Sequence, residues 1–290
     1  MTSYEEWTAA QRTATVEVDG HDLEVAYYDS AAHGAAGRSG GDGAPVVFLH
    51  GIPTNSYLFA KTVGPVAEQR RVIAPDMVGY GNSQMTDNFD RSVRAQELMV
   101  GGLVKRLGLG DIDFVGHDLG GGVGLRYAVH NPDRVERLVL SNSVAYDSWP
   151  IQIITDLGLP ESARENSPAD VQEMLAGLFR STLYADEADG EFVEAMTAPW
   201  NSEEGVTSLV RAAVSTNTNH TTEVDPREVR ADTLLLWGLD DEFQPVRWAE
   251  RLEGDIPSCE LVGLEESNHW VPEDRHEAFR EHCAEFLLGG

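Results

Sequence analysis

Short apolar runs alternate with helical stretches along most of this chain, and this alternation is the feature that most restricts its fold. The runs have the length of fully buried strands, for example Val46 to Leu49 and Thr233 to Trp237, and helical patterns separate them. Such alternation is typical of βαβ units, which build a parallel sheet. We therefore expect an α/β fold with a mostly parallel central sheet flanked by helices.

The expected elements follow one another in a regular order. A hairpin of strands 13–18 and 23–28 comes first, because residues of β type flank Asp19-Gly20, a pair that favours a tight hairpin turn. Residues 31–44 are small and Gly-rich and predict a surface loop. The remaining strands are expected at 46–49, 71–74, 114–115, 138–140, 233–237 and 260–262, and the helices at 57–67, 92–107, 120–130, 246–252 and 275–288.

The alternation stops between residues 144 and 226. This segment has helical patterns and turn signals but no clear strand. We expect a helical insertion that follows the strand at 138–140 and lies over the functional site as a cap. The predicted organisation is therefore a core made of residues 1–143 and 227–290 and a cap made of residues 144–226.

The charge balance excludes several classes of partner. The sequence has 49 acidic and 21 basic residues, a formal net charge of −28, and two lysines, Lys61 and Lys105. Nucleic acids and anionic membranes attract basic patches, so we expect neither as a partner. No apolar run approaches the ~20 residues that span a bilayer, and the acidic N-terminus does not resemble a signal peptide. We expect a cytoplasmic protein in which Cys259 and Cys283 are reduced thiols.

The stretch FVGHDLGGG, residues 114 to 122, places a carboxylate between glycines at the end of an expected strand. A strand, a G-x-Nu-x-G turn and a helix form a nucleophile elbow, which holds its central residue exposed above a sheet. Gly116 and Gly120 fit this turn, because a side chain at either position would collide with a neighbouring strand or helix. Taken alone, Asp118 could equally be a helix N-cap.

Three further pieces follow the ends of expected strands. His50 to Pro53 comes after the strand at 46–49, where the loop of an oxyanion hole belongs. Asp241 follows the strand at 233–237, and His269 follows the strand at 260–262. Nucleophile, acid and histidine thus come in the chain order of a catalytic triad. We predict a catalytic triad of Asp118, Asp241 and His269 and an oxyanion hole formed by the backbone N–H groups of Ile52 and Leu119.

With these residues in place, the chain resembles the α/β-hydrolases of the haloalkane dehalogenase and epoxide hydrolase branch over nearly its whole length. The resemblance implies an α/β-hydrolase fold with a helical cap. The pattern G-x-x-D-x-x-x-P from Gly238 to Pro245 implies that the acid is Asp241 and not Asp240. The stretches that carry the resemblance are HGIPTNSYLF (50–59), IAPDMVGYGNS (73–83), GHDLGG (116–121) and NPDRVERLVL (131–140).

An aspartate nucleophile has a definite chemistry. A carboxylate attacks an sp³ carbon without the help of a base and forms an alkyl ester. His269, oriented by Asp241, would then activate a water that hydrolyses the ester of Asp118, while the backbone N–H groups stabilise the oxyanion. We therefore expect a hydrolase that acts on a small apolar molecule, haloalkane-like or epoxide-like, and that uses no cofactor and no metal.

Two positions depart from the family pattern. Dehalogenases commonly hold the halide with an Asn after H-G and a Trp after the nucleophile, and these positions hold Ile52 and Leu119, whose side chains donate no hydrogen bond. The arginine that follows the aspartate in fluoroacetate dehalogenases is also absent. Two alternatives therefore stay open: an esterase or lactonase on the same fold, and a catalytically silent α/β-hydrolase that binds a small ligand.

Several other residues could belong to the substrate pocket. Tyr146 and Tyr184 could protonate the oxygen of an opening epoxide, and Trp149 and Trp200 could donate N–H groups or simply pack the cap onto the core. His220 could face the pocket or be a surface histidine. The expected partner is a small-molecule substrate, and nothing in the sequence indicates an oligomeric state. The candidate pocket residues are His50, His117, Tyr146, Trp149, Tyr184, Trp200, His220 and Trp270.

The charge also predicts that stability depends on salt. An excess of acids with few lysines is typical of proteins from salt-rich cytoplasms, because self-repulsion destabilises such a chain in dilute buffer. We expect the midpoint of thermal unfolding to rise from dilute buffer to about 2 M KCl, where the Debye length falls to a few ångströms. A midpoint that stays constant would favour the alternative, an acidic protein that is not adapted to salt.

Overall fold

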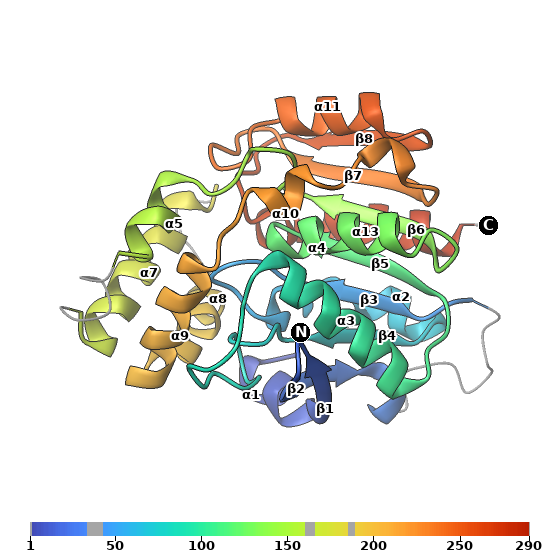
Figure 1. Cartoon of the computed structure of the whole chain (residues 1–290). Coiled ribbons are helices and arrows are strands. Elements are labelled where there is room, and N and C mark those ends of the chain that lie inside the picture. Colours follow the sequence, from blue (N-terminus) through green and yellow to red (C-terminus); the bar gives the residue numbers. More distant parts are fainter. Residues whose placement is uncertain (1, 34–42, 160–165, 185–188, 290) are drawn as a thin grey trace.

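A computed structural model describes residues 2–33, 43–159, 166–184 and 189–289 of the chain. Its centre is an eight-stranded sheet with the order β1-β2-β4-β3-β5-β6-β7-β8. All neighbouring pairs from β4 onward are parallel, whereas β2 is antiparallel to both β1 and β4. The expected mostly parallel α/β sheet is thus confirmed, and Figure 1 shows it running through the middle of the molecule.

The N-terminal hairpin forms where it was expected. Strands β1 (Arg12–Val18) and β2 (His21–Asp29) pair with Val18 opposite His21, so that two residues form the turn. Both turn residues have positive φ, 48° at Asp19 and 83° at Gly20, as the tight turns of right-twisted hairpins require. The short helix α1 (Tyr4–Ala10), which was not expected, precedes the hairpin and buries Trp7.

The parallel strands are short and, apart from β8, mostly buried, as their apolar composition predicts. β3 is fully buried and covers the four residues expected for it, β4 is shifted by one residue, and the others extend the expected strands by a few residues. Their bounds are β3 (Val46–Leu49), β4 (Val72–Pro75), β5 (Ile112–His117), β6 (Val135–Ser141), β7 (Asp232–Gly238) and β8 (Cys259–Leu264).

Helices cover both faces of the sheet. On one face α3 (Val93–Leu107) and α4 (Leu119–His130) pack together, and on the other α2 (Gly64–Gln69) packs against α13 (His276–Leu288). α11 (Arg247–Asp255) lies against β7 and β8. None of the helices among the described residues is long and apolar enough to cross a membrane.

One expected helix is divided in the structure, and another is preceded by an additional helical turn. The helix expected at 57–67 was wrong: residues Ser56–Phe59 form the 3₁₀ turn η2, and α2 begins only at Gly64. Pro65 lacks an N–H and fits the start of a helix rather than its middle. The closing helix is preceded by a separate turn, α12 (Val271–Asp274). Of the Gly-rich loop expected at 31–44, residues 34–42 lie outside the described residues, and the 3₁₀ turn η1 (Ser30–His33) occupies its start.

Between β6 and β7 the described part of the chain is helical. Figure 1 shows α5, α7, α8 and α9 grouped at the left, beyond the ends of the strands and not beside an edge strand. Two hydrogen bonds tie this group to the loop after β3: Asn55 Nδ2 donates to Ala195 O at 2.8 Å, and Trp200 Nε1 donates to Pro53 O at 3.1 Å. The division at residues 144–226 stays a prediction. The helical elements are α5 (Gln152–Leu157), α7 (Pro168–Thr182), α8 (Gly190–Thr197), η3 (Ala198–Trp200), α9 (Glu203–Val214) and α10 (Asn219–Thr222).

The tight crossing of α4 over β3 predicts opposite effects of one substitution at two glycines. A Cβ on Gly120 would lie 2.0 Å from the carbonyl oxygen of Leu49, so Gly120→Ala should lower the free energy of unfolding by about 1–3 kcal/mol. Gly177 is an exposed position of α7 where a Cβ meets nothing within 4 Å. Gly177→Ala should raise that free energy by about 0.5–1 kcal/mol through helix propensity. Urea unfolding of both variants measures these two changes. If both substitutions changed the free energy of unfolding equally, the close packing of α4 on β3 at Gly120 would be contradicted.

Candidate functional site

A sharp turn between β5 and α4 presents Asp118 at the carboxyl edge of the sheet. Asp118 has φ 54° and ψ −118°, a conformation outside the usual regions for a residue with a side chain. The turn is tight because its two glycines touch backbone: a Cβ on Gly116 would lie 2.4 Å from the carbonyl oxygen of Gly120, which in turn packs on Leu49. The local structure is therefore the strand, turn and helix of a nucleophile elbow.

The carboxylate of Asp118 faces the loop after β3 and not its own helix. Oδ1 accepts a hydrogen bond of 2.9 Å from the backbone N–H of Ile52. Although Asp118 is the N-cap residue of α4, its side chain accepts no hydrogen bond from the described N–H groups at the start of this helix. Leu119, the first residue of α4, carries one of the N–H groups that have no partner within a helix. Asp118 is 3% exposed, so the carboxylate is nearly shielded from water.

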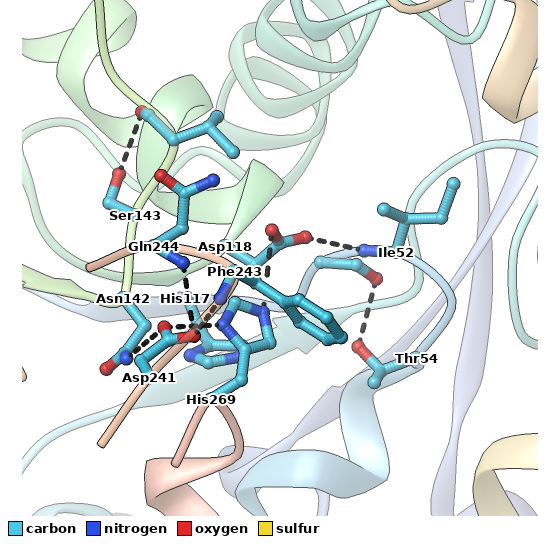
Figure 2. A network of polar contacts seen from close by, with 12 residues as sticks. Ile52, Thr54, His117, Asp118, Asn142, Ser143, Asp241, Phe243, Gln244 and His269 are labelled. Carbon is cyan, nitrogen blue, oxygen red and sulfur yellow. Dashed lines mark hydrogen bonds and ion pairs between the residues drawn. The ribbon is translucent and has the colours of Figure 1, made fainter. Parts of the chain in front are cut away.

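His269 lies between two carboxylates. Its Nδ1 is 2.8 Å from Asp241 Oδ2, and its Nε2 is 3.7 Å from Asp118 Oδ2. Figure 2 shows the imidazole ring between these two acids. The structure thus brings together the three residues that the sequence assigned to a triad, and it places Asp241 rather than the exposed Asp240 against the histidine.

The charges around His269 decide its protonation. Burial of the ring disfavours the cation, but the nearby carboxylates of Asp241 and Asp118 outweigh it and raise the pKa of His269 to about 10. At neutral pH the ring is therefore an imidazolium. An imidazolium has no free nitrogen to accept a proton, so it cannot act as a base in this state.

Asp241 is oriented by groups that sequence reasoning did not identify. Its Oδ2 accepts a 2.5 Å hydrogen bond from Asn142 Nδ2, and its Oδ1 accepts from the N–H groups of Phe243 at 2.7 Å and Gln244 at 3.1 Å. Burial opposes ionisation, yet His269 and these donors hold the pKa of Asp241 below its ordinary value. Asn142 directly follows β6, and the polar run Ser141-Asn142-Ser143 at the end of a buried strand is the signal that could have indicated it.

Two further histidines, His50 and His117, are buried near the triad. His50 Nε2 accepts from the N–H of Met77 at 3.0 Å, so Nδ1 carries the proton that it donates to Gly51 O at 2.8 Å. His50 therefore supports the loop that carries Ile52. The ring of His117 packs 5.0 Å from that of His269. Burial and the neighbouring cation hold the pKa of His117 well below its ordinary value, so it adds no second charge.

A small, mostly apolar cavity adjoins Asp118 and His269. It holds about 20 Å³, which is room for one water molecule. A larger groove of about 740 Å³ lies between β1 and α3 and contains none of the triad residues, so we assign the functional site to the small cavity. Its walls are formed by Ile52, Pro53, Asp118, Trp149, Ile151, Ile153, Ile154, Leu178, Phe243, Gln244, His269 and Trp270.

A more polar cavity of about 180 Å³ also adjoins the triad. His269 and Phe243 border both cavities, so these two side chains separate them. The remaining walls of the polar cavity come from Ser181, Thr182, Asp241, Glu242 and Asn268. Water can thus approach His269 from a side that is distinct from the apolar cavity.

Two of the candidate tryptophans line the apolar cavity, and they differ in their hydrogen bonding. Trp270 Nε1 donates to Thr182 Oγ1 at 2.7 Å. Trp149 is 3% exposed, and its Nε1 has no hydrogen-bond partner among the described residues. Trp149 therefore brings an unused N–H donor to a wall that it shares with Asp118.

The other six candidate residues, His50 and His117 among them, are absent from the described walls of this cavity. Trp200 donates to the backbone of the β3 loop, and Tyr146 donates from its hydroxyl to Asp255 at 2.7 Å. His220 is half-buried at α10, where burial and Arg126 lower its pKa. Tyr184 is 48% exposed.

The backbone of Tyr184 nevertheless connects the helical segment to the loop of His269. Its N–H donates to Asp274 Oδ1 at 2.9 Å, and the other oxygen of Asp274 accepts from the N–H of Asn268 at 2.9 Å. Burial raises the pKa of Asp274 to about 6 despite these bonds. Lys61 makes a parallel connection, with Asp189 at 3.0 Å and Glu273 at 2.6 Å.

Comparison with known proteins agrees with this architecture. The haloalkane dehalogenase 2 of Mycobacterium tuberculosis is 27% identical over 266 residues, which cover 87% of this chain and 91% of that protein. The 2-hydroxy-6-oxo-2,4-heptadienoate hydrolase of Pseudomonas putida is 29% identical over 252 residues, covering 85% and 90%. The solved structure of the epoxide hydrolase CorEH superimposes with a TM-score of 0.76 at 24% identity, covering 96% of this chain and 98% of that one.

The family assignment rests on a match to a family model. Residues 44–275 match the model of the family described as alpha/beta hydrolase fold. The match begins just before β3 and ends after His269, so it contains the elbow, the loop of Ile52 and the whole predicted triad. The chain therefore belongs to the α/β-hydrolase family.

Proposed function

We propose that this protein hydrolyses a carbon–halogen bond of a small apolar substrate through a covalent ester of Asp118. The observation that carries the proposal is the placement of the Asp118 carboxylate. One of its oxygens accepts the N–H of Ile52 at 2.9 Å, and the other faces Nε2 of His269 at 3.7 Å. An acid at this position of an elbow has a nucleophilic oxygen directed toward the cavity and a histidine ready for the second step.

In the first step Asp118 Oδ2 attacks the carbon that bears the halogen. The carbon–oxygen bond forms as the carbon–halogen bond breaks, and the halide leaves with the bonding electron pair. A carboxylate is already anionic at neutral pH, so this step needs no base. The protonated state of His269 in the free protein is therefore compatible with it.

In the second step His269 becomes a base because Asp118 has lost its charge. An ester is neutral, so one of the two carboxylates that raise the pKa of His269 no longer does so. The ring can then release its proton and accept another, at Nε2, from a water beside the ester. The hydroxide attacks the ester carbon, the N–H groups of Ile52 and Leu119 stabilise the oxyanion, and His269 returns the proton to the departing alcohol.

Trp149 is the residue that favours a halide as leaving group. Trp149 lines the same cavity as Asp118, and its Nε1–H has no hydrogen-bond partner among the described residues; an indole N–H donates a hydrogen bond but accepts none. A halide is a weak base that needs only such a donor. Trp149 would thus take over the task for which the side chains of Ile52 and Leu119 are unsuited.

An alkoxide leaving group, by contrast, needs a proton. The cap tyrosines were the candidates to supply one, but the hydroxyl of Tyr146 is committed to Asp255, and Tyr184 is half exposed. Neither belongs to the described walls of the cavity. This arrangement favours a halogenated substrate over an epoxide.

The residues that form the cavity walls favour a small substrate and a cap formed by residues 144–226. Ile151, Ile153, Ile154 and Leu178 come from the segment 144–226, which we propose to be a cap that closes over Asp118. With room for about 20 Å³, these aliphatic side chains must move apart to admit even a three-carbon substrate. Their apolar character and the dehalogenase among the relatives both support a haloalkane-like molecule.

The mechanism predicts that Asp118 is modified during turnover and that His269 only releases the product. In His269→Ala the ester should form with 1-bromopropane and then persist, because no base activates the water. Intact-protein mass spectrometry should detect one added propyl group, and mass spectrometry of a digest should locate it on the peptide that contains Asp118. In the wild type, a single turnover in heavy-oxygen water should label the Asp118 carboxylate, since water attacks that carbon.

Asp118→Asn is the matched control, because the amide keeps the shape of the side chain but is a poor nucleophile. It should acquire no propyl group. If the protein cleaves esters with Asp118 acting as a base, the label goes directly to the product. A silent ligand-binding protein would give neither adduct nor label. An active wild type that never labels Asp118 would contradict the covalent mechanism.

The two steps should also differ in their dependence on pH. Ester formation should be constant from about pH 6 to 9, because it requires no deprotonation of His269. Ester hydrolysis should rise with pH through the pKa of His269 in the ester, which lies below the value of about 10 in the free protein, and then level off. Rapid-quench kinetics separate the two rates. A hydrolysis rate that falls as the pH rises would show that His269 acts in its protonated form.

A further inference from the structure

Gln244 lies in the loop after β7, three residues after Asp241, and both its backbone N–H and its backbone carbonyl oxygen are hydrogen-bonded. Its N–H donates to Asp241 Oδ1 at 3.1 Å, and its carbonyl oxygen accepts from Trp237 Nε1 at 2.7 Å. The residue is 1% exposed, and it lines the apolar cavity together with Asp118. The loop that orients the triad therefore also sets the position of this amide side chain.

The amide of Gln244 is only half satisfied. Its Nε2 donates to the carbonyl oxygen of Ser148 at 3.4 Å, and its Oε1 has no hydrogen-bond partner among the described residues. Rotating the amide by half a turn does not help, since it would direct Oε1 at the carbonyl of Ser148. A buried carbonyl oxygen without a partner is costly, so such an atom in a binding cavity indicates a group that the ligand supplies.

Gln244 Oε1 and Trp149 Nε1 are complementary. Within the described part of the chain they are the buried, unpartnered side-chain atoms of the residues that line the Asp118 cavity. One accepts and the other donates, while the same cavity is also lined by the aliphatic residues Ile52, Ile151, Ile153, Ile154 and Leu178. A plain haloalkane would use the donor through its halogen and leave the acceptor unsatisfied.

We propose that Gln244 Oε1 accepts a hydrogen bond from a hydroxyl group of the substrate, so that the substrate class is small halogenated alcohols. This inference rests on the proposed cleavage of a carbon–halogen bond. A single acceptor matches the single O–H of an alcohol, whereas an ammonium group would leave donors unpaired in an apolar cavity. A hydroxyl adds one heavy atom and suits the small volume better than an amide does.

The test compares 2-bromoethanol with 1-bromopropane, which replaces the hydroxyl by a methyl group. Bromide release should give the wild type a higher kcat/KM for the alcohol. Gln244→Leu removes the acceptor at similar size, and it should lower the ratio of the two kcat/KM values by about tenfold, the effect of one hydrogen bond. Gln152→Leu makes the same chemical change on the exposed side of α5 and should leave the ratio unchanged. Asp118→Asn gives the background release.

A purely structural role of Gln244 would lower both rates in Gln244→Leu and keep their ratio, and that result would overturn the inference. Because Gln244→Leu could fail to fold, a second comparison uses the wild type alone. 2-Bromoethyl methyl ether keeps the oxygen but has no O–H, so it should be no better a substrate than 1-bromobutane, which has its shape. An ether that is favoured as strongly as the alcohol would also overturn the inference.

The two proposals fail in different ways. If the wild type releases bromide from both compounds without preference, carbon–halogen cleavage stands and the role of Gln244 is wrong. If it releases bromide from neither compound above the Asp118→Asn background, the proposed function itself is wrong, and the inference that rests on it falls as well.

Discussion

The hydrogen bond from the N–H of Ile52 to Asp118 Oδ1 is the contact on which the rest of the site depends. It joins the loop after β3 to the turn after β5, two strands that are neighbours in the sheet. Asp118 reaches this N–H because Gly120 lets α4 lie against the backbone of Leu49, and because the turn holds φ at 54°. A strained backbone and a close helix crossing are thus maintained for the position of one carboxylate.

That position creates an electrostatic arrangement in which the state of one residue controls another. His269 lies between two buried acids, and together they hold its proton at neutral pH. In the mechanism that we propose, the first step consumes one of those acids, so the reaction itself would lower the pKa of the base that the second step needs. Asn142 and the N–H groups of Phe243 and Gln244 keep the other acid in place throughout. This geometry is compatible with ester formation followed by ester hydrolysis, and neither step requires the triad residues to move.

The sequence could predict the parts of this structure that local patterns determine. The buried strand at 46–49, the Asp19-Gly20 turn and the elbow at Asp118 each have a short signature with a physical cause. The prediction of one helix at 57–67 was wrong because Gly64 and Pro65 begin a new helix, α2, within that range. The polar run after β6 marks Asn142 as a candidate, but its hydrogen bond to Asp241 could not be predicted, because Asp241 lies in a distant segment. The same holds for the Nε1–H of Trp149, which is defined by the lack of a partner among the described residues.

The proposed weak halide site and the acidic composition would have a common physical explanation. The net charge of −28 led us to propose a salt-rich cytoplasm, where chloride would compete for any strong halide site. A pair of convergent donors would hold chloride and block the attack of Asp118. Ile52 and Leu119 offer no side-chain donor, and the one N–H of Trp149 would bind halide more weakly. We infer that a single donor lets chloride leave, while the hydroxyl bound by Gln244 supplies the affinity and orientation that the halogen cannot.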